Sequence, residues 1–229
     1  MLRMILKNKA LAASIFLVAV MALWAQAAGA AASSPGKAVV VDPGHGGYDA
    51  GIVYNSPEGV QINEKDTDLK IAKAVISTLR ASGMEAFATR TVDRYMDISQ
   101  RATAAQAKSP GLFLSVHLSS TGAFNIYVTS LPQDQADPKQ FYLYSNRQRP
   151  YLGESRDFAS ALEQSIKQAF PGVSVIYMEI PLPLLDEIGA PAVMLECPSP
   201  AYFNYRNPAV AGHIAQAVAV AVTAFDEKK

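Results

Sequence analysis

The chain has 229 residues, half of them hydrophobic, and its 20 basic residues balance its 20 acidic residues. This length suits one domain that buries a sizeable core. Because there is no basic excess, net charge gives no basis for binding nucleic acid or an anionic membrane surface, and we expect no nucleic-acid partner.

Residues 1–30 have the pattern of a secretory signal peptide. A basic start is followed by the apolar run "ALAASIFLVAVMALW" and then by the small residues of "AQAAGAAASS". The apolar run is short for a membrane span, so we expect cleavage near residue 27 or 30 and no stable span afterwards. An uncleaved anchor is the alternative.

Export implies an extracytoplasmic location, in the periplasm or the cell wall. Residues 31–37 are predicted as a short lead-in and residues 38–229 as the folded domain. In chain order, we predict a strand at 38–42, a loop at 43–61, a helix from Asn63 to Gly83, a strand at 84–90, a helix from Asp97 or Ser99 to Lys108, strands at 112–118 and 123–130, a surface loop at 131–152, a helix at 154–170, a strand at 190–197 and a helix from 207 onward.

Apolar strands alternate with amphipathic helices along most of the chain. This alternation is typical of βαβ units, whose strands run parallel and whose helices cover the sheet. The predicted fold class is therefore α/β, a single domain with a mostly parallel mixed sheet flanked by helices on both faces.

Three metal-binding side chains stand at the ends of predicted elements. His45 follows the first strand in a glycine-rich turn, Glu64 opens the first helix, and His117 lies near the end of strand 112–118. Ligands of open α/β sheets collect outside the carboxyl ends of the strands, so we expect the three to converge. Two histidines and one carboxylate leave a fourth position open, as in a catalytic Zn²⁺ site. Taken singly, each has an ordinary alternative: a loop histidine, a helix-dipole partner and a core histidine.

Glu196 is a carboxylate near the end of the otherwise apolar strand 190–197. Such a group is costly to bury unless it is paired with another polar group or takes part in a reaction. Beside a metal-bound water it would act as general base and then as general acid, whereas the alternative is a pair with an arginine. Cys197, the only cysteine, excludes an intrachain disulfide and is interpreted as a small buried hydrophobe rather than a nucleophile.

Further polar residues are assigned supporting roles. Asp42 is expected to orient the ring of His45. Arg90, Asp93 and Arg101 are interpreted as a structural ion-pair set at the surface, with a brace behind the site as the alternative. His213, inside the last predicted helix, is interpreted as a packing or surface residue.

Five segments resemble the zinc-dependent N-acetylmuramoyl-L-alanine amidases of the amidase 3 type. They are "VVVDPGHGGYDAG", "NEKD", "TRTVDRYMDISQRATAAQ", "LFLSVHLSS" and "PAVMLEC", and the resemblance covers about residues 38–225. It implies one Zn²⁺ held by His45, Glu64 and His117, with Glu196 activating the water. The implied substrate is peptidoglycan, cut at the amide between the lactyl group of N-acetylmuramic acid and the L-alanine of the stem peptide.

Two segments depart from the pattern of that family. "LSS" at 118–120 stands where the family usually has Ala-Asn-Ala, and "CPSP" from Cys197 replaces a Gly-Phe segment. Both positions line the substrate groove in the family. Two alternatives are therefore kept: a catalytically weak relative that binds peptidoglycan or regulates, and a zinc peptidase acting within the stem peptide. The resemblance also leaves room for a protein activator. A lid over the substrate groove is the alternative for the 131–152 loop, which we expect to be a plain surface loop. We expect the protein to be a monomer.

Overall fold

The computed structural model describes residues 38–131 and 145–228. The predicted signal peptide, the lead-in and most of the 131–152 loop lie outside the described residues. The elements are β1 (Ala38–Pro43), β2 (Val53–Asn55), β3 (Gln61–Asn63), α2 (Glu64–Ala81), β4 (Ala86–Ala88), α3 (Ile98–Gln106), β5 (Pro110–Leu118), β6 (Phe124–Thr129), the 3₁₀ turn η1 (Arg149–Tyr151), α5 (Leu152–Ala169), β7 (Val175–Ile180), α6 (Pro183–Asp186), β8 (Ala192–Cys197) and α7 (Pro208–Asp226).

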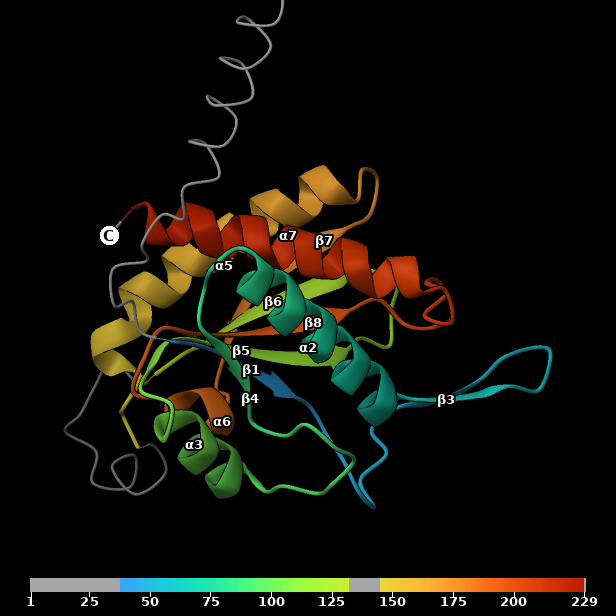
Figure 1. The fold of residues 1–229 in the computed structure, drawn as a ribbon, viewed down its shortest axis with the longest axis horizontal. Helices are drawn as coiled ribbons and strands as arrows, with labels where there is room; N and C mark the ends of the chain where they lie inside the picture. Colours follow the sequence, from blue (N-terminus) through green and yellow to red (C-terminus); the bar gives the residue numbers. More distant parts are fainter. Residues whose placement is uncertain (1–37, 132–144, 229) are drawn as a thin grey trace, which may run out of the picture. The chain divides into compact units, whose positions relative to one another are not determined.

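Six strands form one sheet in the order β4-β1-β5-β8-β6-β7. Every neighbouring pair is parallel except β6 and β8, which run antiparallel. Helices α2, α5 and α7 lie over one face, and α3 and α6 lie on the other (Figure 1). The predicted fold class, a mostly parallel mixed sheet with helices on both faces, is confirmed.

The two faces of the sheet follow from the alternation of side chains along each strand. In β5, Leu112, Leu114 and Val116 pack into the larger apolar cluster beneath α2, α5 and α7. Phe113 points the other way, into a smaller cluster with Leu185 of α6. Because both faces are covered, the central strands contain near-continuous apolar runs, as expected of buried parallel strands.

Helix α7 is long and apolar enough to cross a membrane by length and composition, and half of it is buried. Its buried residues, which include Ile214, Val218 and Phe225, belong to the larger cluster. Among the described residues, α7 is therefore a core helix that covers the sheet. His213 of the same helix is exposed, which agrees with a surface role.

Several elements differ from the prediction. The segment 43–61, predicted as a loop, contains β2 and contributes the first residue of β3, with which β2 forms an antiparallel hairpin. Strand 84–90 shortens to the three residues of β4, and α5 begins at Leu152 instead of 154. β7 and α6 were not predicted. β7 lies at the edge of the sheet with mostly exposed side chains, so it lacks the buried apolar run by which the other strands were recognised.

Candidate metal centre

Three of the predicted site residues converge where β1, α2 and β5 meet. His45 Nε2, Glu64 Oε1 and His117 Nδ1 form a nearly equilateral triangle, with separations of 3.2 Å, 3.2 Å and 3.3 Å. Glu64 is buried at the start of α2, and the two imidazole rings are partly exposed. Residues that are 19, 53 and 72 positions apart are thus brought to one point at the carboxyl ends of the strands, as the topology predicted.

The ring of His45 is oriented by Asp49, four residues later. His45 Nδ1 lies 2.9 Å from Asp49 Oδ2, and a proton on Nδ1 leaves Nε2 as the acceptor that faces the triangle. Asp42, predicted for this role, instead contacts Thr89, Arg101 and Ser115. That prediction was wrong because Asp42 lies on β1 itself, whereas the tight turn between Gly46 and Asp49 returns Asp49 to the ring.

His45 has a left-handed backbone, with φ of +54°, which costs a non-glycine residue on the order of 1–2 kcal/mol. Arg101 offsets this cost by donating to the His45 carbonyl at 2.6 Å and to the Pro43 carbonyl at 2.6 Å. Arg90 donates to the carbonyls of Gly44 and Lys65. These buried arginines therefore hold the loop that carries His45.

Asp93 also belongs to this bracing. Its carboxylate accepts from the Gly47 backbone N–H at 2.7 Å and from Lys65 Nζ at 2.7 Å. Arg90 and Arg101 are buried, and Arg101 pairs with the fully buried Asp42 at 2.9 Å. The set is thus a brace behind the site rather than the surface ion-pair set that was favoured from the sequence.

Two glycines allow the three donor groups to approach one another. A Cβ on Gly44 would clash with the imidazole of His117, and a Cβ on Gly51 would lie 2.6 Å from Glu64 Oε2 and 2.7 Å from His45 Cδ2. Gly51 also has a φ of +63°, in the left-handed region. The glycines of the "GHGGYDAG" segment are therefore needed for space as well as for conformation.

Glu64 is held as a carboxylate. Burial alone would raise its pKa, but the adjacent rings of His117 and His45 and hydrogen bonds from two backbone N–H groups keep that pKa well below its usual range. The Ile52 N–H donates to Oε2 at 2.7 Å, and the Leu118 N–H donates to Oε1 at 2.9 Å. For His45, burial lowers the pKa, yet Glu64 and Asp49 outweigh it and raise the pKa above 6.5.

The donor triangle fits a tetrahedral metal ion. Nitrogen and oxygen ligands at about 2.0–2.1 Å from tetrahedral Zn²⁺ lie about 3.3–3.4 Å from one another, close to the separations found here. Two imidazole nitrogens and one carboxylate oxygen are also a donor set that Zn²⁺ accepts in catalytic sites. The residues present thus fit a metal with one position left for another ligand.

Asp68 is a fourth member of this cluster that was not predicted as a site residue. A potential ligand atom of Asp68 and those of His45, Glu64 and His117 lie within 4.8 Å of one another. Its two oxygens are buried without a hydrogen-bond partner among the described residues. Burial, with Glu64 adding to it, raises the pKa of Asp68 well above its usual range. The sequence signal that could have identified Asp68 is its position four residues after Glu64, which places both carboxylates on one face of the helix.

Glu196 lies beside this cluster. It is the register partner of His117 across β5 and β8, and partners in a parallel pair share a face of the sheet. Its Oε2 accepts hydrogen bonds from Asn125 Nδ2 and Tyr127 Oη, both at 2.9 Å. The arginine pair considered as an alternative for Glu196 is not found within the described residues. Cys197, its neighbour, is fully buried, as predicted.

The two segments that depart from the family pattern contact each other. The Ser119 N–H donates to the Cys197 carbonyl at 2.6 Å, and the Ser199 N–H donates to the Thr121 carbonyl at 2.7 Å. The ring of Tyr202 packs against Gly122. The departures are therefore one joint feature of the structure at the end of β5 and β8, and not two independent losses.

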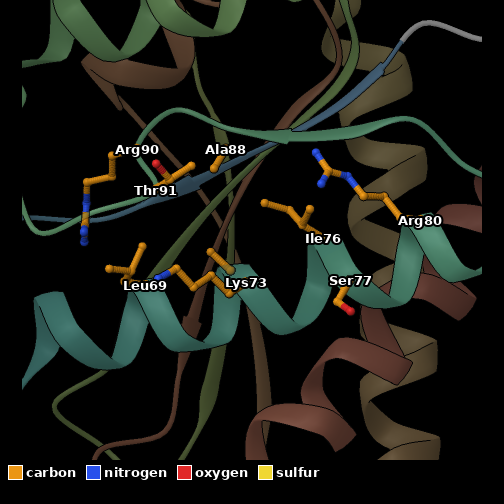
Figure 2. Close-up of a pocket in the computed structure, with 9 residues that line it drawn as sticks. Leu69, Lys73, Ile76, Ser77, Arg80, Ala88, Arg90 and Thr91 are labelled. Carbon is orange, nitrogen blue, oxygen red and sulfur yellow. The ribbon is translucent and has the colours of Figure 1, made fainter.

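A hollow of about 320 Å³ lies elsewhere, between α2 and the segment that follows β4 (Figure 2). Among the described residues that line it, none is His45, Glu64, His117 or Glu196. It is lined by Leu69, Ala72, Lys73, Ile76, Ser77, Arg80, Ala88, Arg90 and Thr91. Arg90 links this hollow to the metal centre, since its guanidinium also holds the Gly44 carbonyl.

Comparison with protein families gives one match over most of the chain. The family described as Amidase_3, N-acetylmuramoyl-L-alanine amidase, matches residues 39–224. A curated relative, the N-acetylmuramoyl-L-alanine amidase AmiA of Escherichia coli, is 41% identical over 88 residues, which are 38% of this chain and 29% of AmiA. The chain spans less than half the length of the first curated relatives it matches, with shares of 44%, 16% and 29%.

Solved structures show the same fold. An N-acetylmuramoyl-L-alanine amidase from Clostridium difficile 630 superimposes with a TM-score of 0.67 at 23% identity, covering 86% of this chain and 100% of that one. The CwlD amidase of Clostridioides difficile, solved in complex with the GerS lipoprotein, gives 0.63 at 17% identity, covering 84% and 100%. At these identities the likeness concerns the fold.

Proposed function

The chain belongs to the N-acetylmuramoyl-L-alanine amidase family, and we propose that it hydrolyses the amide between N-acetylmuramic acid and the L-alanine of the peptidoglycan stem peptide. The observation that carries the proposal is the 3.2–3.3 Å triangle of His45, Glu64 and His117 beside Glu196. A metal position of this kind next to a free carboxylate oxygen suits the hydrolysis of an unactivated amide.

In this proposal, His45 Nε2, Glu64 Oε1 and His117 Nδ1 hold one Zn²⁺. When bound, zinc supplies an activated water and polarises the amide carbonyl. The Nδ1 proton of His45 stays on the Asp49 side, and the backbone donors Ile52 and Leu118 keep Glu64 in place. These contacts aim His45 Nε2 and Glu64 Oε1 at the point that the metal would occupy.

Glu196 is the proposed catalytic residue. As a carboxylate it takes a proton from the attacking water, and as a carboxylic acid it gives that proton to the nitrogen of the leaving L-alanine. A single group serves both steps because the first step protonates it for the second. Its place on the same face of the sheet as His117, one strand away, brings it within reach of both the water and the leaving group.

We place this activity outside the cytoplasmic membrane, in the periplasm or the cell wall, because peptidoglycan is found there and residues 1–30 have the signal pattern. Peptidoglycan is the proposed partner. A protein activator belongs to the same proposal, and the solved complex of the relative CwlD with a lipoprotein is a reason to test for one.

The test uses residues 31–229 of the chain, incubated with purified peptidoglycan and Zn²⁺ beside the Glu196→Gln variant. We expect the first protein to release intact stem peptides that begin with L-alanine, as seen by mass spectrometry, and the variant to release none. Peptides cut internally would instead establish a peptidase. A chain that binds one zinc and pulls down with peptidoglycan but releases nothing, with or without a candidate activator, would be a binding or regulatory relative, and the amidase proposal would be wrong.

A further inference from the structure

We propose that Tyr127 and Asn125 are positioning residues that hold one oxygen of Glu196 and thereby direct its other oxygen toward the His45–Glu64–His117 cluster. The inference rests on the proposed function, in which Glu196 moves the proton. It adds two side chains from β6, a strand to which neither the sequence nor the family resemblance assigned any part of the site.

The placement follows from strand register. His117 of β5 is the partner of Glu196 of β8, and Glu196 is in turn the partner of Asn125 of β6. Neighbouring strands are about 4.8 Å apart, and partners share a face. The three residues therefore stand in one row across the sheet, with Glu196 between the metal-binding histidine and the amide of Asn125. Tyr127, two residues along β6, lies on the same face as Asn125.

Both donors act on the same carboxylate oxygen. Tyr127 Oη and Asn125 Nδ2 each donate to Glu196 Oε2 at 2.9 Å. Within the described part of the chain, no hydrogen bond to Glu196 Oε1 is found. A carboxylate whose two oxygens are equivalent can rotate freely between them, whereas two donors on one oxygen fix the plane of the group and leave the other for proton transfer.

The two donors are themselves held in place. Tyr127 and Asn125 are both buried, with 9% and 7% of their surface exposed. Burial, together with Glu196, raises the pKa of Tyr127 to about 12, so its hydroxyl remains a donor at every pH at which the protein would work. A buried donor on a rigid strand keeps its direction, which a surface side chain does not.

Asn125 is anchored further by Ser119. The Nδ2 group of Asn125 also donates to Ser119 Oγ at 3.1 Å, and that hydroxyl lies 2.9 Å from Thr121 Oγ1. Ser119 belongs to the segment that departs from Ala-Asn-Ala. The departure is therefore connected to Glu196 through two hydrogen bonds, and in this reading it supports the catalytic carboxylate instead of disabling the site.

The experiment compares the full mature chain with Tyr127→Phe, using soluble glycan strands that carry stem peptides as substrate. We expect kcat to fall by about 10- to 100-fold, as for other residues that orient a reacting group, with KM within about twofold. Zinc content and melting temperature should stay at the wild-type values. Ser119→Ala, one contact further away, should lower kcat by less.

Tyr177→Phe is the matched control. Tyr177 lies on the neighbouring strand β7 and likewise hydrogen-bonds a glutamate, Glu179, at 2.5 Å, but at the exposed surface. Its removal should leave kcat and KM unchanged. If Tyr127→Phe retains full kcat in an active wild-type background, or loses kcat only in step with zinc content and melting temperature, the positioning role is wrong.

Crystal structures of the zinc-loaded wild type and Tyr127→Phe provide a readout that needs no turnover. We expect one conformer of the Glu196 carboxylate in the wild type and several, or a rotated one, in the variant. If the wild type is inactive but its Glu196 carboxylate has one conformer and that of the variant has several or a rotated one, the proposed function is wrong and the positioning role stands. An identical, single conformer in both proteins would overturn the positioning role even if the amidase is active.

Discussion

The central sheet carries two faces of different character, although the same strands supply both. Beneath α2, α5 and α7 the side chains form one continuous apolar cluster. Toward α3 and α6 the apolar cluster is small. The carboxyl ends of β1, β5 and β8 carry Asp42, His117 and Glu196 there, and Asn125 lies beside Glu196 near the start of the antiparallel β6. Successive side chains of one strand thus divide between stability and chemistry, so neighbouring positions such as Leu195 and Glu196 should respond to mutation in different ways.

The largest expected effect is on turnover alone. Glu196→Gln keeps the size of the side chain but cannot accept the proton, so kcat should fall by about 10²- to 10⁴-fold. The free energy of unfolding should change by less than about 1 kcal/mol, because Glu196 is only partly buried. Steady-state kinetics and urea denaturation measure the two quantities. A variant that turns over normally would remove Glu196 from the chemistry.

Asp42 and Arg101 test whether the polar face also contributes stability. Arg101→Met leaves the fully buried carboxylate of Asp42 without its ion-pair partner, which should cost about 3–5 kcal/mol of unfolding free energy. It also releases the carbonyl of His45, so zinc affinity should fall. Urea denaturation and competition with a chelator measure these effects, and unchanged values in both would contradict the role given to the brace.

A substitution on the apolar face should lower stability and leave turnover unchanged. Leu114 is fully buried in the larger cluster, and Leu114→Ala should lower the free energy of unfolding by about 2–5 kcal/mol. Its kcat per folded, zinc-loaded molecule should equal that of the wild type. A large loss of kcat in folded Leu114→Ala would show that the two faces are not separable.

The pH dependence of the metal-free protein concerns His45. Burial lowers its pKa, but Glu64 and Asp49 raise it above the unfolded value of 6.5. A raised pKa in the folded state stabilises the protein fully below pH 6.5, and this contribution is lost as pH rises through the folded pKa. Metal-free wild type should therefore lose melting temperature relative to His45→Gln as pH rises above 6.5. Zinc, which competes with the proton, should bind more tightly over the same range.

The smallest effect is expected at the edge of the sheet, far from both faces of the core. Arg156 and Glu179 form a two-pronged pair, with both contacts at 2.9 Å, at the exposed surface of α5 and β7. Arg156→Ala should cost no more than about 1 kcal/mol and leave kcat unchanged. Chemical denaturation that gave several kcal/mol would mean that β7 depends on this pair.

The sequence predicted most of the layered fold because buried strands and amphipathic helices leave strong patterns. It also predicted that His45, Glu64 and His117 meet, since parallel strands end at one edge. It missed β7, whose mostly exposed side chains give only a weak apolar pattern. It also missed the hairpin of β2 and β3, which lies within a segment rich in glycine and proline.

The remaining site residues depend on contacts that local sequence does not encode. Asn125 and Tyr127 reach Glu196 only because β6 inserts antiparallel beside β8, about 70 residues away along the chain. Asp49 rather than Asp42 holds His45 because of a four-residue turn. Asp68 was visible as a carboxylate four residues after Glu64, but its isolation from hydrogen-bond partners is a property of tertiary packing.

Digestion of purified peptidoglycan by the zinc-loaded chain in water enriched in ¹⁸O tests the proposed reaction most directly. One ¹⁸O should enter the lactyl carboxylate of N-acetylmuramic acid, and the released stem peptides should begin with L-alanine and carry no label. Label in an α- or side-chain carboxylate of the stem peptide, with the muramic acid unlabelled, would contradict the account and assign the site to a peptidase.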